Sequence, residues 1–224
     1  MEDRYRKNIG DRFPEEIQNA CLTKTVAVVG AGGVGGYIIE HFARLGVKKI
    51  IIFDGDNFEL SNINRQRFCN LKTIGKNKAE SAKEAINNIN DEVEVIAIND
   101  YFSNKYFDVI TSNNVDIVIY AADPYVNVTE LNEAISNCLL HRIPIIRGAV
   151  GNTVIMIDFI DPANLHLWFE LKSATLHQSV NDKCEYISAL SNYCALVGGF
   201  VLEMFIAYMK NPKMTSRSFN YNIN

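Results

Sequence analysis

The chain has 224 residues, of which 48% are hydrophobic and 21% are charged, and its formal net charge is −4 at pH 7. This composition is ordinary for a globular domain with a sizeable apolar core, and the acidic balance argues against a non-specific nucleic-acid binder. The first residues are charged and no long apolar segment follows them, so we expect a cytoplasmic protein without a secretion signal. The five cysteines form no Cys-x-x-Cys pair, which predicts reduced thiols and no structural zinc.

The first predicted unit, residues 1–24, is an N-terminal arm rich in charged residues, with a short helix expected after Pro14. A strand is predicted over residues 25–29, because five consecutive apolar or β-branched residues suit a buried parallel strand. A glycine loop follows the strand. A helix follows the loop, because apolar residues recur there at helical spacing.

The glycine loop carries the pattern Gly-x-Gly-x-x-Gly at Gly30, Gly32 and Gly35. In this pattern the first glycine permits a tight turn, the second lets the backbone approach a phosphate, and the third lets the helix pack on the strand. The start of the helix directs unpaired N–H groups to the same place, which favours an anion. We therefore expect a nucleotide phosphate to bind at Gly30, Gly32, Gly33 and Gly35.

A second strand, residues 50–53, ends before Asp54, about 20 residues beyond the loop, where a carboxylate can bond a ribose hydroxyl. The segment after it is polar and cationic. It lies just past the carboxyl end of a strand, where ligands of open α/β sheets bind. Its candidate nucleotide-site residues are Asp56, Asn62, Arg65 and Gln66.

A helix is expected over residues 76–90, with Lys78 near its start, and a strand is expected over residues 93–98. A short helix and turn over residues 101–114 leads to an apolar strand that ends at Asp123. An enzyme that expels pyrophosphate needs Arg and Lys beside the phosphates and a carboxylate for Mg²⁺, whereas a nicotinamide dehydrogenase does not. This interpretation makes Asp123 the candidate metal ligand.

The second half of the chain continues the alternation of strands and helices. We expect a helix over residues 126–140 and strands over residues 143–148 and 153–160. The last strand is predicted to be antiparallel, because the connection before it is too short for a crossover. The whole order predicts an α/β fold: a Rossmann-like, doubly wound, mostly parallel sheet with antiparallel C-terminal strands. Residues 25–160 would form its nucleotide-binding core.

Residues 161–224 are predicted to hold a crossover region, a buried helix and a terminal strand of the same domain. The run 194–209 is apolar nearly all round, but it is slightly short for a membrane span and carries Glu203 at its centre. We therefore expect a helix that is buried in the domain or at a dimer interface.

The sequence resembles the ThiF/MoeB family, the ATP-dependent adenylyltransferases that activate ubiquitin-like proteins, and their bacterial relatives. The matching pieces occur in the expected order: Arg4-Tyr5-Arg6, the glycine loop, Asp54-Gly55-Asp56, residues 61–66, residues 75–81 and Asp123. The chain departs from the family pattern in lacking both Cys-x-x-Cys pairs and in having Pro124 where an asparagine usually follows the aspartate. It thus resembles a divergent member without zinc.

The resemblance implies an enzyme that adenylates a carboxylate with ATP and Mg²⁺ and releases pyrophosphate. Arg65, Lys78 and the partner subunit's Arg6 would hold the phosphates in a homodimer, and Asp123 would position Mg²⁺. The acceptor would be the C-terminus of a small ubiquitin-like protein or a peptide. Some family members use a cysteine thiol to take the acyl group. For Cys184, that role and no role at all both stay open.

Two other functions remain as alternatives. An NAD-dependent oxidoreductase would explain the glycines and Asp54, but it leaves Arg65, Lys78 and Asp123 without a task. A non-catalytic family member that only binds a partner is consistent with Pro124 and with the missing zinc motifs. No nucleic-acid or membrane partner is expected.

Overall fold

The computed structural model describes residues 3–122, 128–151, 154–163, 166, 168, 170 and 189–222. The strands are β1 Thr25–Val29, β2 Lys49–Phe53, β3 Glu94–Ile98, β4 Ile117–Tyr120, β5 Ile145–Val150, β6 Val154–Ile160 and β7 Arg217–Asn222. The α-helices are α1 Glu15–Cys21, α2 Gly33–Leu45, α3 Lys78–Asn87, α4 Phe107–Ser112, α5 Val128–Leu140 and α7 Ser191–Lys210. Short 3-10 helices are η1 Asp3–Asn8, η2 Leu60–Asn62 and η3 Asn104–Tyr106.

The strands form one sheet in the order β3-β2-β1-β4-β5-β6-β7. The five strands from β3 to β5 in this order run parallel, whereas β6 and β7 are antiparallel to their neighbours. This topology confirms the predicted doubly wound, mostly parallel sheet with antiparallel C-terminal strands. The ends of the elements differ from the predicted ones by a few residues. The helix expected from residue 76, for example, begins at Lys78 because Asn77 caps it.

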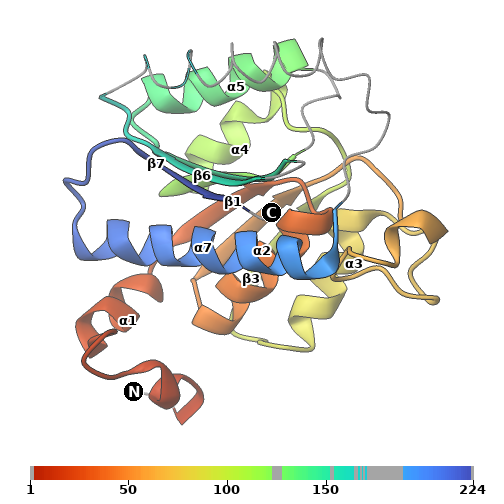
Figure 1. Ribbon diagram of the computed structural model, residues 1–224, viewed down its shortest axis with the longest axis horizontal. Helices are drawn as coiled ribbons and strands as arrows, with labels where there is room; N and C mark the ends of the chain where they lie inside the picture. The colour runs from red at the N-terminus through yellow and green to blue at the C-terminus, as the bar shows by residue number, and fades with distance from the viewer. Residues whose placement is uncertain are drawn as a thin grey trace.

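Helices cover both faces of the sheet, with α4 and α5 on one face and α2, α3 and α7 on the other (Figure 1). The alternation along β1 explains the two layers, because Val26 and Val28 belong to one apolar cluster and Ala27 and Val29 to the other. All five residues of β1 are buried, as expected for a parallel strand at the centre of a covered sheet.

Helix α7 packs one side on the domain, and its remaining residues are half-buried or exposed among the described residues. Its buried residues recur at helical spacing: Cys194, Val197, Gly198, Val201 and Phe205. Phe205 meets Phe42 of α2 edge-on, with the ring centroids 5.0 Å apart. In the part of the chain described, α7 is the one helix long and apolar enough to cross a membrane, a test by length and composition that core helices of soluble proteins also pass. About a third (33%) of its apolar stretch is buried, so the described residues leave part of its apolar surface uncovered.

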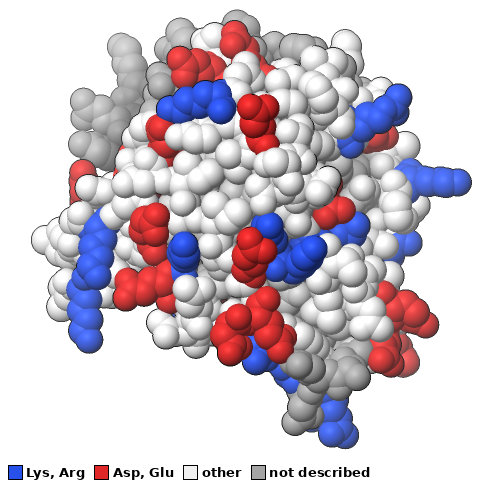
Figure 2. All heavy atoms as spheres, turned by 180° about the vertical axis from the view of Figure 1, so that it is seen from behind, with Lys and Arg blue, Asp and Glu red and all other residues white. Residues whose placement is uncertain are grey.

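Acidic and basic side chains are interspersed on the molecular face seen in Figure 2. Among the described residues on that face, no broad patch of a single sign stands out. A nucleic-acid-binding surface would show a basic stripe or patch, so this face gives no support to such a partner.

The N-terminal arm is fastened to the sheet through Tyr5. The Tyr5 side chain is buried, and its hydroxyl accepts a hydrogen bond from Asn90 Nδ2 at 2.9 Å and donates one to Glu92 Oε2 at 3.2 Å. Asn90 and Glu92 come directly before β3, so η1 lies at the amino-terminal edge of the parallel strands. This edge is opposite the one where the glycine loop leaves β1.

We expect Tyr5→Phe to lower the free energy of unfolding by about 1 kcal/mol, because it removes the hydroxyl that Asn90 and Glu92 share. In a protein of this size the loss corresponds to about 2–4 °C in Tm, which thermal unfolding by circular dichroism measures. The control is Tyr221→Phe in the exposed strand β7, which should leave Tm unchanged. An unchanged Tm for Tyr5→Phe would show that the hydroxyl does not hold the arm.

Candidate functional site

The glycine loop joins β1 to α2 at the end of the sheet where the parallel strands have their carboxyl ends, called this edge below. Gly30 has a φ of +96°, in the left-handed region that favours glycine, and its N–H donates to Phe53 O at 2.8 Å. A Cβ atom on Gly35 would lie 1.9 Å from Gly30 O. The turn therefore requires the first glycine of the pattern, and the close packing of α2 on the loop requires the third.

The start of helix α2 is a place where an anion is favoured. Gly32 is the N-cap and Gly33 the first helical residue, and no side chain caps the helix. The Arg65 side chain lies across this helix start, since its Cγ and Cδ are 3.7 and 3.8 Å from the position of a Cβ on Gly33. The Arg65 guanidinium donates from Nη1 to Ser61 O at 3.1 Å and to Asn64 Oδ1 at 2.9 Å. The stem of Arg65 thus lies beside the positive end of the α2 dipole, and its charge adds to a helix start that already favours an anion.

Gln66 lies beside the second glycine of the pattern. Its Nε2 is 3.7 Å from the position of a Cβ on Gly32, and the residue is 8% exposed. Its Oε1 is buried and finds no hydrogen-bond partner among the described residues. A buried acceptor without a donor is unfavourable by about 1–3 kcal/mol, so this oxygen is suited to accept a hydrogen bond from a ligand in the loop.

Asp54 fixes the glycine loop through its carboxylate. Its Oδ2 accepts from the N–H of Ala31 at 2.7 Å, and its Oδ1 accepts from the N–H of Asp56 at 2.9 Å. Burial raises the pKa of this carboxyl above its usual value. Each carboxylate oxygen can accept a further hydrogen bond, so Asp54 keeps the capacity to bond a ribose hydroxyl, and that role stays a prediction.

Asp56 joins two side chains from distant segments of the chain. Its Oδ2 accepts from Lys78 Nζ at 2.8 Å, and its Oδ1 accepts from the Tyr101 hydroxyl. Burial acts to raise the pKa of Asp56, but the hydrogen bonds from Lys78 and Tyr101 outweigh it and hold the pKa below its usual value. The hydrogen bond to Asp56 raises the pKa of Tyr101 to about 12. The Lys78 ammonium is thereby held at the same edge as the glycine loop and Asp54.

Two residues that the sequence analysis did not single out, Asn77 and Tyr101, organise this edge. Asn77 Oδ1 caps α3 by accepting from the N–H of Glu80 at 3.0 Å, and its Nδ2 donates to the carbonyl oxygens of Asp54 and Asp56 at 2.9 Å each. The spacing Asn-x-x-Glu before a helix is a capping signal that points to Asn77 in the sequence. No local pattern marks Tyr101, because its partner Asp56 lies 45 residues away.

Asn62 and Arg67 hold the segment between β2 and α3 in place. Asn62 is buried, and its Oδ1 accepts from the N–H of Glu59 at 3.0 Å, which closes the turn at η2. Arg67 forms an ion pair with the buried Glu40 of α2. These contacts attach the segment that carries Arg65 to the glycine-loop helix. A nucleotide contact by Asn62 stays a prediction.

The remaining predicted residues are not brought to this edge by the described structure. Arg6 is exposed in η1, at the opposite end of the sheet from the glycine loop of its own chain. Asp123, Pro124 and Cys184 lie outside the described residues. The described chain before Asp123 does run beside the loop, since the N–H of Ala121 donates to Val29 O at 2.9 Å. The roles of Arg6 and Asp123 and the open question of Cys184 stay predictions.

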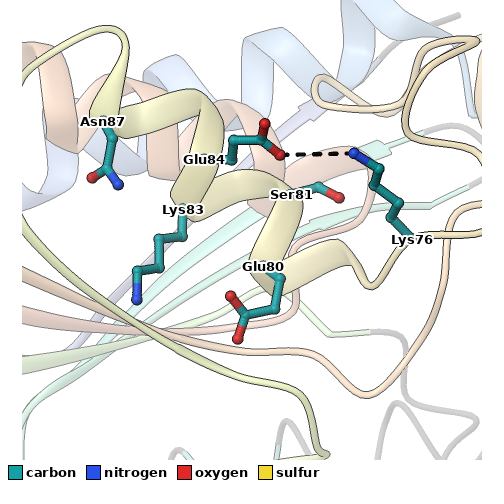
Figure 3. A pocket seen from close by; sticks show the side chains of 6 residues that line it. All are labelled: Lys76, Glu80, Ser81, Lys83, Glu84 and Asn87. Atoms are coloured by element: carbon teal, nitrogen blue, oxygen red, sulfur yellow. Dashed lines mark ion pairs between the residues drawn. The ribbon is translucent and has the colours of Figure 1, made fainter.

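A hollow of about 300 Å³ lies apart from this edge, on the outer side of α3 (Figure 3). Its lining carries charges of both signs on one helix and the residue before it: Lys76, Glu80, Ser81, Lys83, Glu84 and Asn87. Lys76 and Glu84 form a loose ion pair at 3.9 Å, drawn as a dashed line in Figure 3. Such a mixture is typical of a solvated helix surface, and we assign the hollow no function.

The fold and its glycine loop define a class, the doubly wound nucleotide-binding α/β proteins. Within this class, residues 5–224 match the ThiF family. The chain therefore belongs to the ThiF family, and the resemblance that its motifs suggested is confirmed.

Individual relatives cover part or all of the chain. The tRNA threonylcarbamoyladenosine dehydratase of Bacillus subtilis (strain 168) is 35% identical over 147 residues, which cover 65% of this chain and 55% of that protein. The molybdopterin-synthase adenylyltransferase of Escherichia coli (strain K12) is 29% identical over 147 residues, covering 65% and 57%. The crystal structure of E. coli MccB with ATP shares the fold with a TM-score of 0.77 at 19% identity, covering 100% of this chain and 72% of that chain. The matches to the two curated relatives thus span little more than half of those proteins.

Proposed function

We propose that this protein activates a carboxylate by adenylation. A carboxylate oxygen attacks the α-phosphorus of ATP, the bond to the β-phosphate oxygen breaks, pyrophosphate leaves, and an acyl-adenylate remains. The observation that carries this proposal is the placement of the uncapped helix start, Arg65 and the ion-paired Lys78 at the same end of the sheet. The choice of ATP is supported by two relatives, one named as an adenylyltransferase and one crystallised with ATP.

Each side chain at this edge has a task in the proposal. The glycine loop and Asp54 hold the AMP part of the substrate, and Gln66 Oε1 accepts a hydrogen bond from it. Arg65 and Lys78 face the two phosphates that leave. Negative charge grows on these phosphates during the reaction, so fixed cations stabilise the transition state more than bound ATP. The protein thus acts by holding the groups in line and by neutralising charge.

Mg²⁺ would add positive charge at the phosphates, and Asp123 is the proposed ligand. Carboxylate oxygen is the ligand type that Mg²⁺ prefers, so the residue type fits the ion. Asp123 is outside the described residues, and no step above depends on the ion.

The proposal includes a homodimer in which the partner subunit's Arg6 completes the phosphate site. The position of Arg6 supports an action between subunits, because the 13-residue helix α2, about 20 Å long, separates the arm's anchor from the glycine loop of the same chain. The apolar surface of α7 that the described residues leave uncovered is a candidate surface for the partner. We further propose a cytoplasmic enzyme whose acceptor is the C-terminus of a ubiquitin-like protein or a peptide.

Thermal unfolding with Mg-ATP, with NAD and without ligand tests the nucleotide. We expect Mg-ATP to raise Tm and NAD to have no effect, because a ligand at a hundredfold its Kd adds about 2.7 kcal/mol to stability. Arg65→Ala should reduce the shift given by Mg-ATP. Arg217→Ala in the exposed strand β7 is the control and should keep the full shift.

The outcomes separate the three functions. Stabilisation by NAD alone would overturn the proposal in favour of an oxidoreductase. Pyrophosphate release is assayed with synthetic peptides that end in glycine and with ubiquitin-like proteins as acceptors. Binding of Mg-ATP without any release of pyrophosphate would favour the non-catalytic binder.

A further inference from the structure

The loop after β3 is built to a fixed shape. Asp100 Oδ1 accepts from the N–H of Tyr101 at 2.8 Å, and its Oδ2 accepts from Lys105 Nζ and from the Tyr106 hydroxyl, each at 2.6 Å. The hydrogen bond from Lys105 is the largest of the effects that lower the pKa of Asp100 to about 2. Phe102 is buried, with its ring 4.8 Å from that of Phe53. The backbone that carries Tyr101 is therefore anchored on both sides.

Tyr101 is presented at the candidate nucleotide edge by this loop. Its ring lies against Gly55, where a Cβ would be 3.0 Å from Cε2, and its hydroxyl donates to Asp56 Oδ1. The side chain is not part of the core, since the residue is 38% exposed. Packing of the apolar core therefore does not explain why the loop holds a tyrosine here.

The Asp56–Lys78 pair explains the need for such an anchor. The Lys78 side chain is 10% exposed, and an ammonium removed from water is favourable only beside a carboxylate. The Asp56 side chain is 44% exposed, and without a second contact only its bond to Lys78 would set its orientation. With Oδ2 on Lys78 and Oδ1 on Tyr101, each oxygen of Asp56 has a fixed partner.

We propose that Tyr101 is a positioning residue for Lys78, because its hydroxyl holds Asp56 in the orientation that directs the Lys78 ammonium to the nucleotide edge. The inference rests on the proposed function, in which Lys78 meets the phosphates that leave. The hydroxyl also disperses negative charge on Asp56 that would otherwise repel those phosphates. Loss of the hydroxyl should therefore weaken the binding of ATP. It should leave the binding of AMP unchanged, because AMP lacks the two leaving phosphates.

The test measures the Kd of Mg-ATP and of AMP by calorimetry for the wild type and Tyr101→Phe. We expect Tyr101→Phe to raise the Kd of Mg-ATP about three- to tenfold, as for a lost hydrogen bond to a charged group that is partly in water, and to leave the Kd of AMP within about twofold. The matched control is Tyr106→Phe, which removes a hydroxyl from the same loop where it bonds Asp100 instead of Asp56. Both affinities should stay unchanged in the control.

A double-mutant cycle with Asp56→Asn shows whether the tyrosine acts through Asp56. If it does, Tyr101→Phe should change the Kd of Mg-ATP less than about twofold in the Asp56→Asn background. Three results would overturn the inference: an unchanged or tighter Mg-ATP complex for Tyr101→Phe, an equal loss for AMP, or the same effect in both backgrounds.

Failure of the nucleotide site gives a different result, because the wild type would then bind neither nucleotide. A protein that binds Mg-ATP without releasing pyrophosphate fails the proposed function but still allows both affinities to be measured. The contact between Tyr101 and Asp56 can still be tested without nucleotide by carboxyl ¹³C NMR titration of Asp56. The charged and titratable groups that face this carboxylate are Asp54, Lys78 and Tyr101. Tyr101→Phe should raise the pKa of Asp56, since it removes a donor that favours the ionised form. An unchanged pKa would overturn the inference whatever the protein binds.

Discussion

Gly35→Ala is expected to lower the free energy of unfolding by about 3 kcal/mol or more and to abolish nucleotide binding. The new methyl group would lie 1.9 Å from Gly30 O and 2.7 Å from Gly30 C, and both of these atoms belong to the backbone. A flexible side chain could move away, but this loop is held by the bond from Gly30 to Phe53 and by the bond from Ala31 to Asp54. Relief of the clash therefore requires α2 to move away from the loop.

Thermal unfolding measures the loss of stability. Gly35→Ala should lower Tm by about 6–12 °C in a chain of this size. Gly199→Ala is the matched control, because Gly199 also lies within a helix but a Cβ there would meet nothing within 4 Å. The control should raise stability by about 0.5–1 kcal/mol, since alanine favours helix over glycine. If Gly35→Ala were as stable as Gly199→Ala, the tight contact between loop and helix would be refuted.

Lys78→Met is expected to slow the release of pyrophosphate from Mg-ATP about 100- to 1000-fold. This is the effect of removing one fixed group that stabilises charge in a transition state. Methionine keeps most of the side-chain volume, so α3 should keep its place and Tm should change little. AMP affinity should also change little, because the proposed partners of Lys78 are the phosphates that leave.

The control for Lys78→Met is Lys76→Met, two residues earlier on the rim of the α3 hollow in Figure 3. Lys76 reaches only a loose ion pair with Glu84, so its loss should leave the rate within about twofold of the wild type. Equal rates for the two variants would remove Lys78 from the phosphate site. Pyrophosphate release is measured with synthetic peptides that end in glycine or with ubiquitin-like proteins as acceptors.

Much of the site was predictable because its signals are local. The turn at Gly30 and the packing of Gly35 depend on residues within one loop, and the structure has both as the pattern requires. The segment with Arg65 and Gln66 was predicted to lie near the loop because the carboxyl ends of parallel strands share one edge of the sheet. The fixing of the loop by Asp54 and the cap by Asn77 went unrecognised, although Asn77 carries a local signal.

The sequence by itself determined the class of fold, the glycine loop and the family. Apolar periodicity and glycine spacing extend over a few residues, so they can be recognised without knowing which distant residues are in contact. Only the tertiary structure decided which side chains meet. Tyr101 reaches Asp56 across 45 residues, and Tyr5 accepts from Asn90 across 85. Hydrogen bonds between segments so far apart depend on strand order and on how each helix lies on the sheet. These features arise from burial of the whole core, and no short stretch of sequence carries them.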